Sequence, residues 1–150
     1  MATIIVWRTD REVFEPGTLM PWRGDHIATL DSANKDAELA LRAAMTDGHN
    51  LRANSLYTWR DEDWARSTWQ KQPTDYLYKL EVEESDIRHT GDLCYYTEIR
   101  EALARNGCAA AAIRAYATGA DFIPERHFKP RVEILVGKPK ILERFSPPPT

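Results

Sequence analysis

The sequence predicts an α+β domain. Segments with strand patterns and segments with helix patterns alternate along the chain, but the strand segments are short and irregularly spaced, which argues against a regular βαβ repeat. With 150 residues, 43% of them hydrophobic, the chain is long enough for one core, and we expect a single domain over residues 1–145. Residues 146–150 read Ser-Pro-Pro-Pro-Thr and are expected to form a flexible, extended tail.

The first strand is expected over residues 3–8, where β-branched residues follow one another. Residues 17–31 are rich in proline, glycine and aspartate and are expected to form a loop. A helix is expected over 33–47, with Ser32 as its N-cap and Gly48 at its end.

A short strand is expected over 55–58, and Asp61 is expected to begin a helix that Pro73 stops. Residues 76–82 alternate aromatic and aliphatic side chains with polar ones, which is a strong strand pattern.

In the last third of the chain, a helix is expected over 96–106 with Thr97 as its cap, followed by an alanine-rich helix over 108–118. The last strong strand is expected over 131–136, and 140–142 are expected to add an edge strand.

Net charge, hydrophobic run length and cysteine spacing exclude several classes of function. The formal net charge of −3 provides no overall basic field that would attract nucleic acid. No apolar run is long enough for a transmembrane helix, and the first residues lack a basic secretory leader, so we expect a cytoplasmic protein with no membrane partner. The two cysteines lack metal-ligand spacing, and no metal site is expected.

Three polar residues at the ends or centres of expected strands could carry chemistry. Arg8 ends the first strand, and its planar fork could hold a phosphate or a carboxylate through two hydrogen bonds. Thr58 ends a strand that leads into a helix, and Glu133 lies in the last strong strand. Each also has a structural interpretation: Arg8 as a salt-bridge partner, Thr58 as a strand-end residue, and Glu133 as a solvent-facing residue of an edge strand.

The order of these residues resembles the ADP-ribosyltransferase superfamily. Trp7-Arg8-Thr9-Asp10, with the later Pro21-Trp22-x-Gly24, is similar to the opening of pertussis-toxin-like enzymes. Leu56-Tyr57-Thr58 resembles the strand–threonine–helix segment found across the superfamily, and Val132 to Val136 resembles the glutamate-bearing strand of its DNA-modifying members.

The resemblance implies a split, mixed β-sheet with flanking helices and an NAD-dependent transfer of ADP-ribose to a macromolecule. Cleavage of the nicotinamide–ribose bond passes through an oxocarbenium-like state, which a carboxylate can stabilise. By resemblance, Glu133 is the catalytic carboxylate and Arg8 holds the pyrophosphate, so the two should converge on one pocket. The expected NAD-binding residues are Arg8, Asp10, Trp22, Tyr57 and Thr58.

The acceptor is expected to be a nucleic acid in preference to a protein. Arg131 stands two residues before Glu133, where a cation would repel a protein arginine, and Arg131 and Lys129 are therefore candidate acceptor-binding residues. A toxin or other effector fits this activity, and NAD hydrolysis is a close variant. The alternatives are a non-catalytic module that binds a partner in an aromatic cleft, and a metal-free ribonuclease.

Overall fold

The computed structural model describes residues 2–120 and 131–148. Its strands are β1 (Thr3–Asp10), β2 (Leu56–Trp59), β3 (Tyr76–Glu83), β4 (Ile87–Asp92), β5 (Val132–Val136) and β6 (Lys140–Phe145). Its α-helices are α1 (Ser32–Ala44), α2 (Gly48–Ala53), α3 (Glu62–Trp69), α4 (Leu93–Ala104) and α5 (Ala110–Ala117). Two 3₁₀ turns, η1 (His26–Thr29) and η2 (Glu84–Asp86), complete the described elements.

The six strands form one sheet in the order β4-β5-β2-β1-β3-β6. The expected α+β class is confirmed. The expected mixture of parallel and antiparallel pairs is wrong, because every pairing of the described strands is antiparallel.

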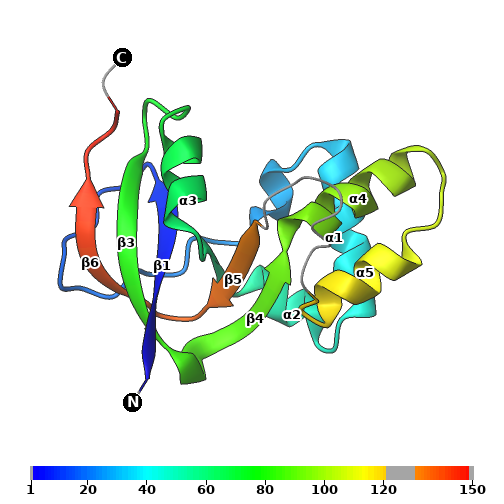
Figure 1. Ribbon diagram of the computed structural model, residues 1–150, viewed down its shortest axis with the longest axis horizontal. Helices are drawn as coiled ribbons and strands as arrows, with labels where there is room; N and C mark the ends of the chain where they lie inside the picture. The colour runs from blue at the N-terminus through cyan, green and yellow to red at the C-terminus, as the bar shows by residue number, and fades with distance from the viewer. Residues whose placement is uncertain (1, 121–130, 149–150) are drawn as a thin grey trace.

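The sheet is nearly divided between β1 and β2. These two strands are joined in register at a single pair, Trp7 opposite Trp59, whereas β1 pairs with β3 along its whole length. Beyond that pair a side chain replaces the backbone ladder, since Arg8 Nη1 donates to the Tyr57 carbonyl at 2.9 Å. One half of the sheet is therefore β6-β3-β1 and the other is β2-β5-β4, as Figure 1 shows.

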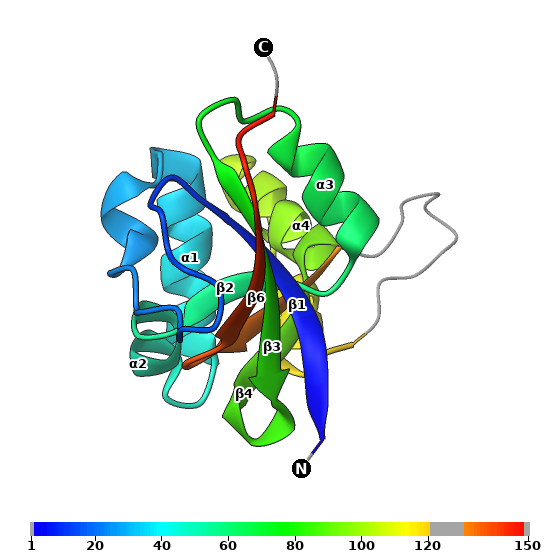
Figure 2. The same cartoon turned by 90° about the vertical axis from the view of Figure 1, so that its left-hand side faces the viewer.

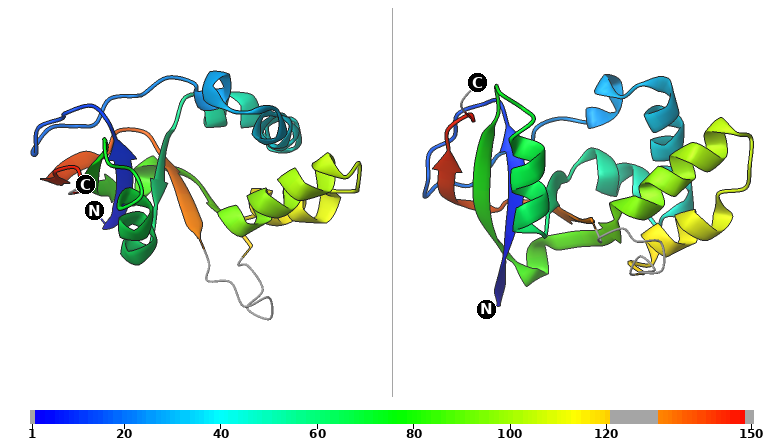
Figure 3. Two further views of the ribbon diagram at one scale, coloured as in Figure 1. Left: turned by 90° about the horizontal axis from the view of Figure 1, so that it is seen from above. Right: turned by 45° about the horizontal axis from the view of Figure 1, so that its top comes forward.

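The main core lies on the face of the sheet that carries Val6, which we call the inner face. Residues from both halves meet there, so the sheet curls around this cluster (Figure 3). The loop after β1 closes it with Met20, which is fully buried. That loop is fixed to the sheet, because Gly17 N donates to Ile141 O at 2.8 Å and Tyr78 Oη donates to Glu12 O at 2.6 Å. The cluster consists of Val6, Met20, Leu56, Tyr78, Leu80, Val82, Val132, Ile134, Val136 and Ile141.

Helices cover the other face, which we call the outer face. On the β1–β3 half, α3 packs Ala65 against Trp7 and Leu77. Beside the other half, α1, α4 and α5 form a second cluster around Leu41, Ile99 and other apolar side chains. Because the sheet curls, these helices point in different directions, and Figure 2 shows α1 and α2 to the left of the strands and α3 to the upper right.

Most expected elements are present, with shifted ends. Asp31 rather than Ser32 caps α1, because its carboxylate accepts from Asn34 N at 2.9 Å. Gly48 begins α2 rather than ending α1: a Cβ there would lie 2.4 Å from the Arg42 carbonyl oxygen, so the tight turn between the helices requires glycine.

Two expectations about residues 83–106 are wrong or incomplete. No strand is expected from the sequence where β4 lies, because its residues read Ile-Arg-His-Thr-Gly-Asp and lack apolar alternation. Helix α4 begins at Leu93 with Asp92 as its cap, and Thr97 lies inside the helix, where its hydroxyl donates to the Leu93 carbonyl.

Candidate functional site

A pocket of about 180 Å³ lies beside the point where β1 and β2 diverge. It combines two arginines, a histidine and a tyrosine from β1, β2 and the loop between β1 and α1. Its lining residues are Arg8, Arg23, Gly24, His26, Ser55, Leu56 and Tyr57.

A larger hollow of about 520 Å³ lies at the far end of β1, beside Thr3. Its lining mixes acidic residues with Lys138 and Lys140, and Glu81 stands directly opposite Lys140 on neighbouring strands. Because its charges of opposite sign already face one another, this hollow offers less to an ionic ligand than the Arg8 pocket.

Arg8 reaches the pocket from the inner face of β1. Its Nη1 donates to the Tyr57 carbonyl at 2.9 Å and its Nη2 to Asp10 Oδ2 at 3.3 Å, while its buried Nε has no hydrogen-bond partner among the described residues. Burial lowers the pKa of the guanidinium, and the neighbouring Asp10 opposes this shift. An arginine retains its charge under such conditions, so Arg8 brings a positive charge and an unused donor to the site.

Arg23 provides the second guanidinium of the pocket. Its Nε and Nη2 donate to the two oxygens of Asp10 at 2.9 and 3.3 Å, and its guanidinium stacks 5.3 Å from the centre of the Phe14 ring. Burial would raise the pKa of Asp10, but hydrogen bonds from Arg23 and from the backbone N–H of Glu12 hold it below its usual value. Two guanidinium groups therefore share one carboxylate, which leaves an excess of positive charge.

His26 and Tyr57 form the wall of the pocket nearest the helices. Their rings meet edge to face, with centres 4.3 Å apart. His26 Nε2 lies 3.3 Å from a carboxylate oxygen of Glu38, and the Tyr57 hydroxyl donates to the Arg52 carbonyl at 2.7 Å. Both pocket residues are thus fixed by contacts to α1 and α2.

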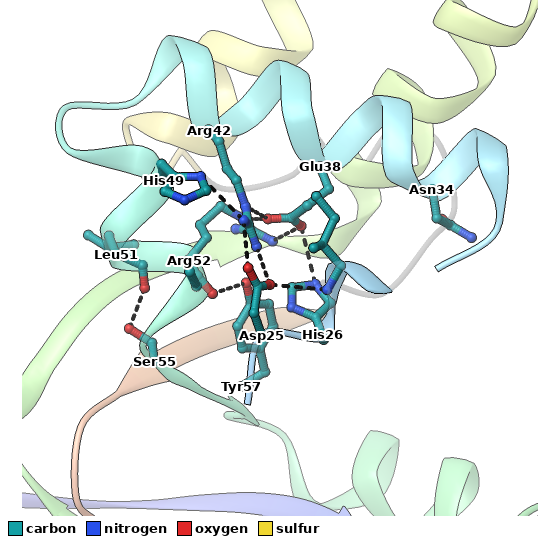
Figure 4. A network of polar contacts seen from close by, with 12 residues as sticks. Asp25, His26, Asn34, Glu38, Arg42, His49, Leu51, Arg52, Ser55 and Tyr57 are labelled. Carbon is teal, nitrogen blue, oxygen red and sulfur yellow. Dashed lines mark hydrogen bonds and ion pairs between the residues drawn. The ribbon is translucent and has the colours of Figure 1, made fainter. Parts of the chain in front are cut away.

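Behind this wall lies a network of charged side chains, drawn in Figure 4. Its centre is Glu38, whose carboxylate is fully buried and accepts from Arg42 Nε at 2.9 Å and from Arg52 Nε and Nη2 at 2.6 and 2.9 Å. Arg42 also binds both oxygens of Asp25, at 2.7 and 3.1 Å. Two arginines thereby connect α1, α2 and the loop that leads into η1.

The network shifts the pKa values of its carboxyl groups. Burial opposes ionisation of Glu38, but hydrogen bonds from His26, Arg52 and Arg42 lower its pKa well below the usual range. The hydrogen bonds from Arg42 lower the pKa of Asp25 to about 2. Both groups are therefore ionised at neutral pH, and both require their arginine partners.

Glu133 belongs to this network and not to the pocket. Trp7, Trp59 and Glu133 are register partners on the outer face, whereas Arg8 points to the inner face. Glu133 is 5% exposed; the Tyr116 hydroxyl donates to it, and Arg52 Nη2 lies 3.9 Å from it. The expected convergence of Arg8 and Glu133 on one pocket is therefore wrong, as is the alternative of a solvent-facing Glu133.

The inner face of β5 supplies no replacement acid, since it carries Val132, Ile134 and Val136. Burial raises the pKa of Glu133, and Arg52 opposes that shift. Between the pocket and Glu133 stand the Tyr57 ring and the Arg52 guanidinium, whose central carbon lies 5.2 Å from the ring centre.

The remaining expected site residues are distributed as follows. Asp10 and Tyr57 lie at the Arg8 pocket. Thr58 is 1% exposed, and its hydroxyl donates to the Ile134 carbonyl at 2.6 Å, which ties β2 to β5. Trp22 is exposed and does not line the pocket, although Arg23 and Gly24 after it do, and its indole N–H donates to the Ala53 carbonyl at 3.0 Å.

Of the two candidate acceptor-binding residues, Arg131 and Lys129, the structure describes only Arg131. The Arg131 guanidinium stacks 5.2 Å from the Trp64 ring centre and donates to Thr97 Oγ1 at 3.1 Å. Lys129 lies outside the described residues.

Sequence reasoning missed Arg23, His26, Glu38 and Arg52. Arg23 and His26 could have been found, because Arg23 lies within the Pro21-Trp22-x-Gly24 segment and His26 lies two residues after it. Glu38 and Arg42 are spaced four residues apart, which is typical of a surface ion pair, and nothing in the sequence marks this pair as buried.

No protein-family model, curated protein or solved structure matches this chain. Among the described residues, no group of three histidine, cysteine, aspartate or glutamate side chains is placed to hold a metal ion. No helix in the described part of the chain has both the length and the apolar character needed to cross a membrane.

Proposed function

We propose that this protein binds the diphosphate of an NAD-class dinucleotide in the Arg8 pocket. The observation that carries the proposal is that the guanidinium groups of Arg8 and Arg23, from separate segments, meet in one pocket and share a single carboxylate. Arginine forks bind phosphate oxygens in pairs, and an arginine held by a sheet and an anchored loop needs little reorganisation to do so.

The size of the pocket fits part of such a ligand. Pockets that enclose a whole drug-sized molecule measure about 300–1,000 Å³. A pocket of about 180 Å³ can accept a diphosphate while the bases of the dinucleotide remain outside. The bound phosphates would accept hydrogen bonds from Arg8 and Arg23 either together with the Asp10 carboxylate or in its place.

The placement of Glu133 favours binding without bond cleavage. A carboxylate that stabilises a ribosyl cation must touch the sugar, whereas Glu133 does not line the pocket and is separated from it by Tyr57 and Arg52. We therefore infer a module with an ADP-ribosyltransferase-like arrangement of strands that holds its ligand without using Glu133. The near-division of the sheet beside Arg8 supports this inference about the fold.

ADP-ribosyl transfer is the second candidate, favoured by one observation: Arg8 and Tyr57, from two separate motifs of the resemblance, do line the same pocket. In that reaction the nicotinamide–ribose bond breaks, nicotinamide leaves with the bonding electrons, and a nucleic-acid or protein nucleophile bonds to the ribose carbon. With water as the nucleophile the same step is NAD hydrolysis. For this reaction the Glu133 carboxylate would have to give up its hydrogen bond from the Tyr116 hydroxyl and contact the ribose of the ligand.

Calorimetric titration with NAD, together with chromatographic detection of nicotinamide, separates these functions. We expect wild type to bind NAD without releasing nicotinamide, and Arg23→Gln to weaken binding about tenfold or more. Arg66→Gln is a matched control, since Arg66 is 35% exposed with its Nε 2.7 Å from Glu62, while Arg23 is 33% exposed with its Nε 2.9 Å from Asp10.

Equal loss of binding in both arginine variants, or no binding by wild type, would overturn the proposal. Release of nicotinamide by wild type that Glu133→Gln abolishes would establish cleavage of NAD instead, by transfer or by hydrolysis, with Glu133 as the catalytic residue.

A further inference from the structure

Trp22 differs from every other tryptophan of the chain. It is 53% exposed, whereas Trp7, Trp59, Trp64 and Trp69 are buried or half-buried. Exposing an indole forgoes a large gain from burial, so an exposed tryptophan beside a pocket calls for a reason.

The Trp22 ring is exposed but also fixed. Its indole N–H donates to the Ala53 carbonyl at 3.0 Å, which satisfies the polar edge of the ring and ties the loop to the end of α2. Met20, two residues earlier, is fully buried and anchors the same loop. A ring held by its edge in this way can offer a face to a ligand at a small cost in conformational entropy.

Both segments joined by the Trp22 hydrogen bond run on into the lining of the Arg8 pocket. Arg23 and Gly24, which follow Trp22 in the chain, line that pocket, and so does Ser55, two residues after the carbonyl that holds the indole. A base attached through ribose to a diphosphate held by Arg8 and Arg23 would therefore emerge beside Trp22.

We propose that Trp22 is a stacking platform for the adenine base of the bound nucleotide, so that the site selects nucleoside diphosphates over phosphates that carry no base. This inference rests on the proposed function and deepens it. Aromatic side chains bind bases by stacking on their faces, and the pocket itself is too small for base and diphosphate together.

The test compares the affinities of ADP and inorganic pyrophosphate by calorimetry in four proteins: wild type, Trp22→Ala, Trp22→Phe and Leu39→Ala. Trp22→Ala should weaken ADP binding about five- to a hundredfold and leave pyrophosphate affinity within about twofold. Trp22→Phe keeps a ring and should recover part of the ADP affinity. Leu39→Ala removes an apolar side chain that is 50% exposed on α1, and it should change neither affinity.

Four results would overturn the inference. Equal losses for ADP and pyrophosphate in Trp22→Ala would mean that Trp22 only positions the loop that carries Arg23. Unchanged ADP affinity in that variant would mean that the base lies elsewhere. If wild type binds pyrophosphate but not ADP, the base is excluded while the diphosphate site stands; if wild type binds neither ligand, the proposed function fails as well.

Discussion

The substitution Glu38→Gln removes the negative charge at the centre of the buried network. The Glu38 side chain is fully buried, and those of its partners Arg42 and Arg52 are 3% and 1% exposed, so water cannot replace the lost carboxylate. The new amide group would also place N–H donors against guanidinium N–H groups. Breaking a buried ion pair in this way costs about 3–5 kcal/mol, a large part of the roughly 5–15 kcal/mol by which a typical domain is stable.

Urea unfolding followed by tryptophan fluorescence measures this loss. With a urea slope of about 2 kcal/mol per M, the midpoint of Glu38→Gln should fall by about 2 M. The matched control is Glu62→Gln, because Glu62 pairs with Arg66 four residues later at 2.7 Å but is 50% exposed. An exposed pair contributes about 0–1 kcal/mol, so the control should lose little.

The loss should also depend on pH. Because the pKa of Glu38 is lowered in the folded protein, its stabilising contribution is present above the pKa of an unfolded glutamate, about 4.3, and falls as the pH drops toward the folded value. The difference between wild type and Glu38→Gln should therefore shrink below about pH 4. Equal midpoints for Glu38→Gln and Glu62→Gln at pH 7 would refute the view that the network stabilises the fold.

Three further substitutions test separate features by the same assay. Burial raises the pKa of Glu133, so wild type should lose stability relative to Glu133→Gln as the pH rises from the pKa of an unfolded glutamate, about 4.3, toward the folded value, and parallel pH curves would contradict this. Thr58→Val removes the hydroxyl bond to the Ile134 carbonyl and should cost about 1 kcal/mol, whereas an unchanged midpoint would show that this bond adds nothing. Gly91→Ala would place a Cβ 2.7 Å from Tyr116 Cε2 and should cost about 1–3 kcal/mol; a neutral result would mean that the tyrosine moves aside.

The strands and helices that could be predicted are those whose side chains carry a strong local pattern. Strand β3 alternates apolar and polar residues and was expected within one residue of its observed ends. A helix beginning at Asp61 was also expected, and α3 follows Asp61, whose carboxylate caps it by accepting from Trp64 N at 3.0 Å. Such signals depend on neighbours in the chain and need no tertiary contact.

Strand β4 could not be predicted in this way. Its residues carry almost no apolar alternation, and it is a strand because β5 supplies hydrogen-bond partners along it. Helix α4 then follows directly, capped by Asp92, which ends β4. A strand defined by its neighbour becomes visible only when the sheet is assembled.

The candidate site was likewise predicted in part from the sequence and decided in part by the folded structure. The sequence placed Arg8 at the end of a strand with Asp10 beside it, and both lie at the pocket. It could not place Glu133, because alternation along β5 assigns Glu133 and Val132 to opposite faces without saying which face the pocket occupies. That choice follows from the register of Trp59 opposite Glu133 and of Trp7 opposite Trp59.

By itself the sequence determined the α+β class, the anchored arginine of the first strand and the caps and alternations that mark individual elements. Only the tertiary structure decided that the sheet is antiparallel and nearly divided beside Arg8, that Arg23 joins Arg8, and that Glu133 is enclosed with Arg52 and Tyr116. The physical reason is that propensity and capping act between residues close in the chain, whereas strand register, burial and charge pairing arise between segments that meet only when the chain folds.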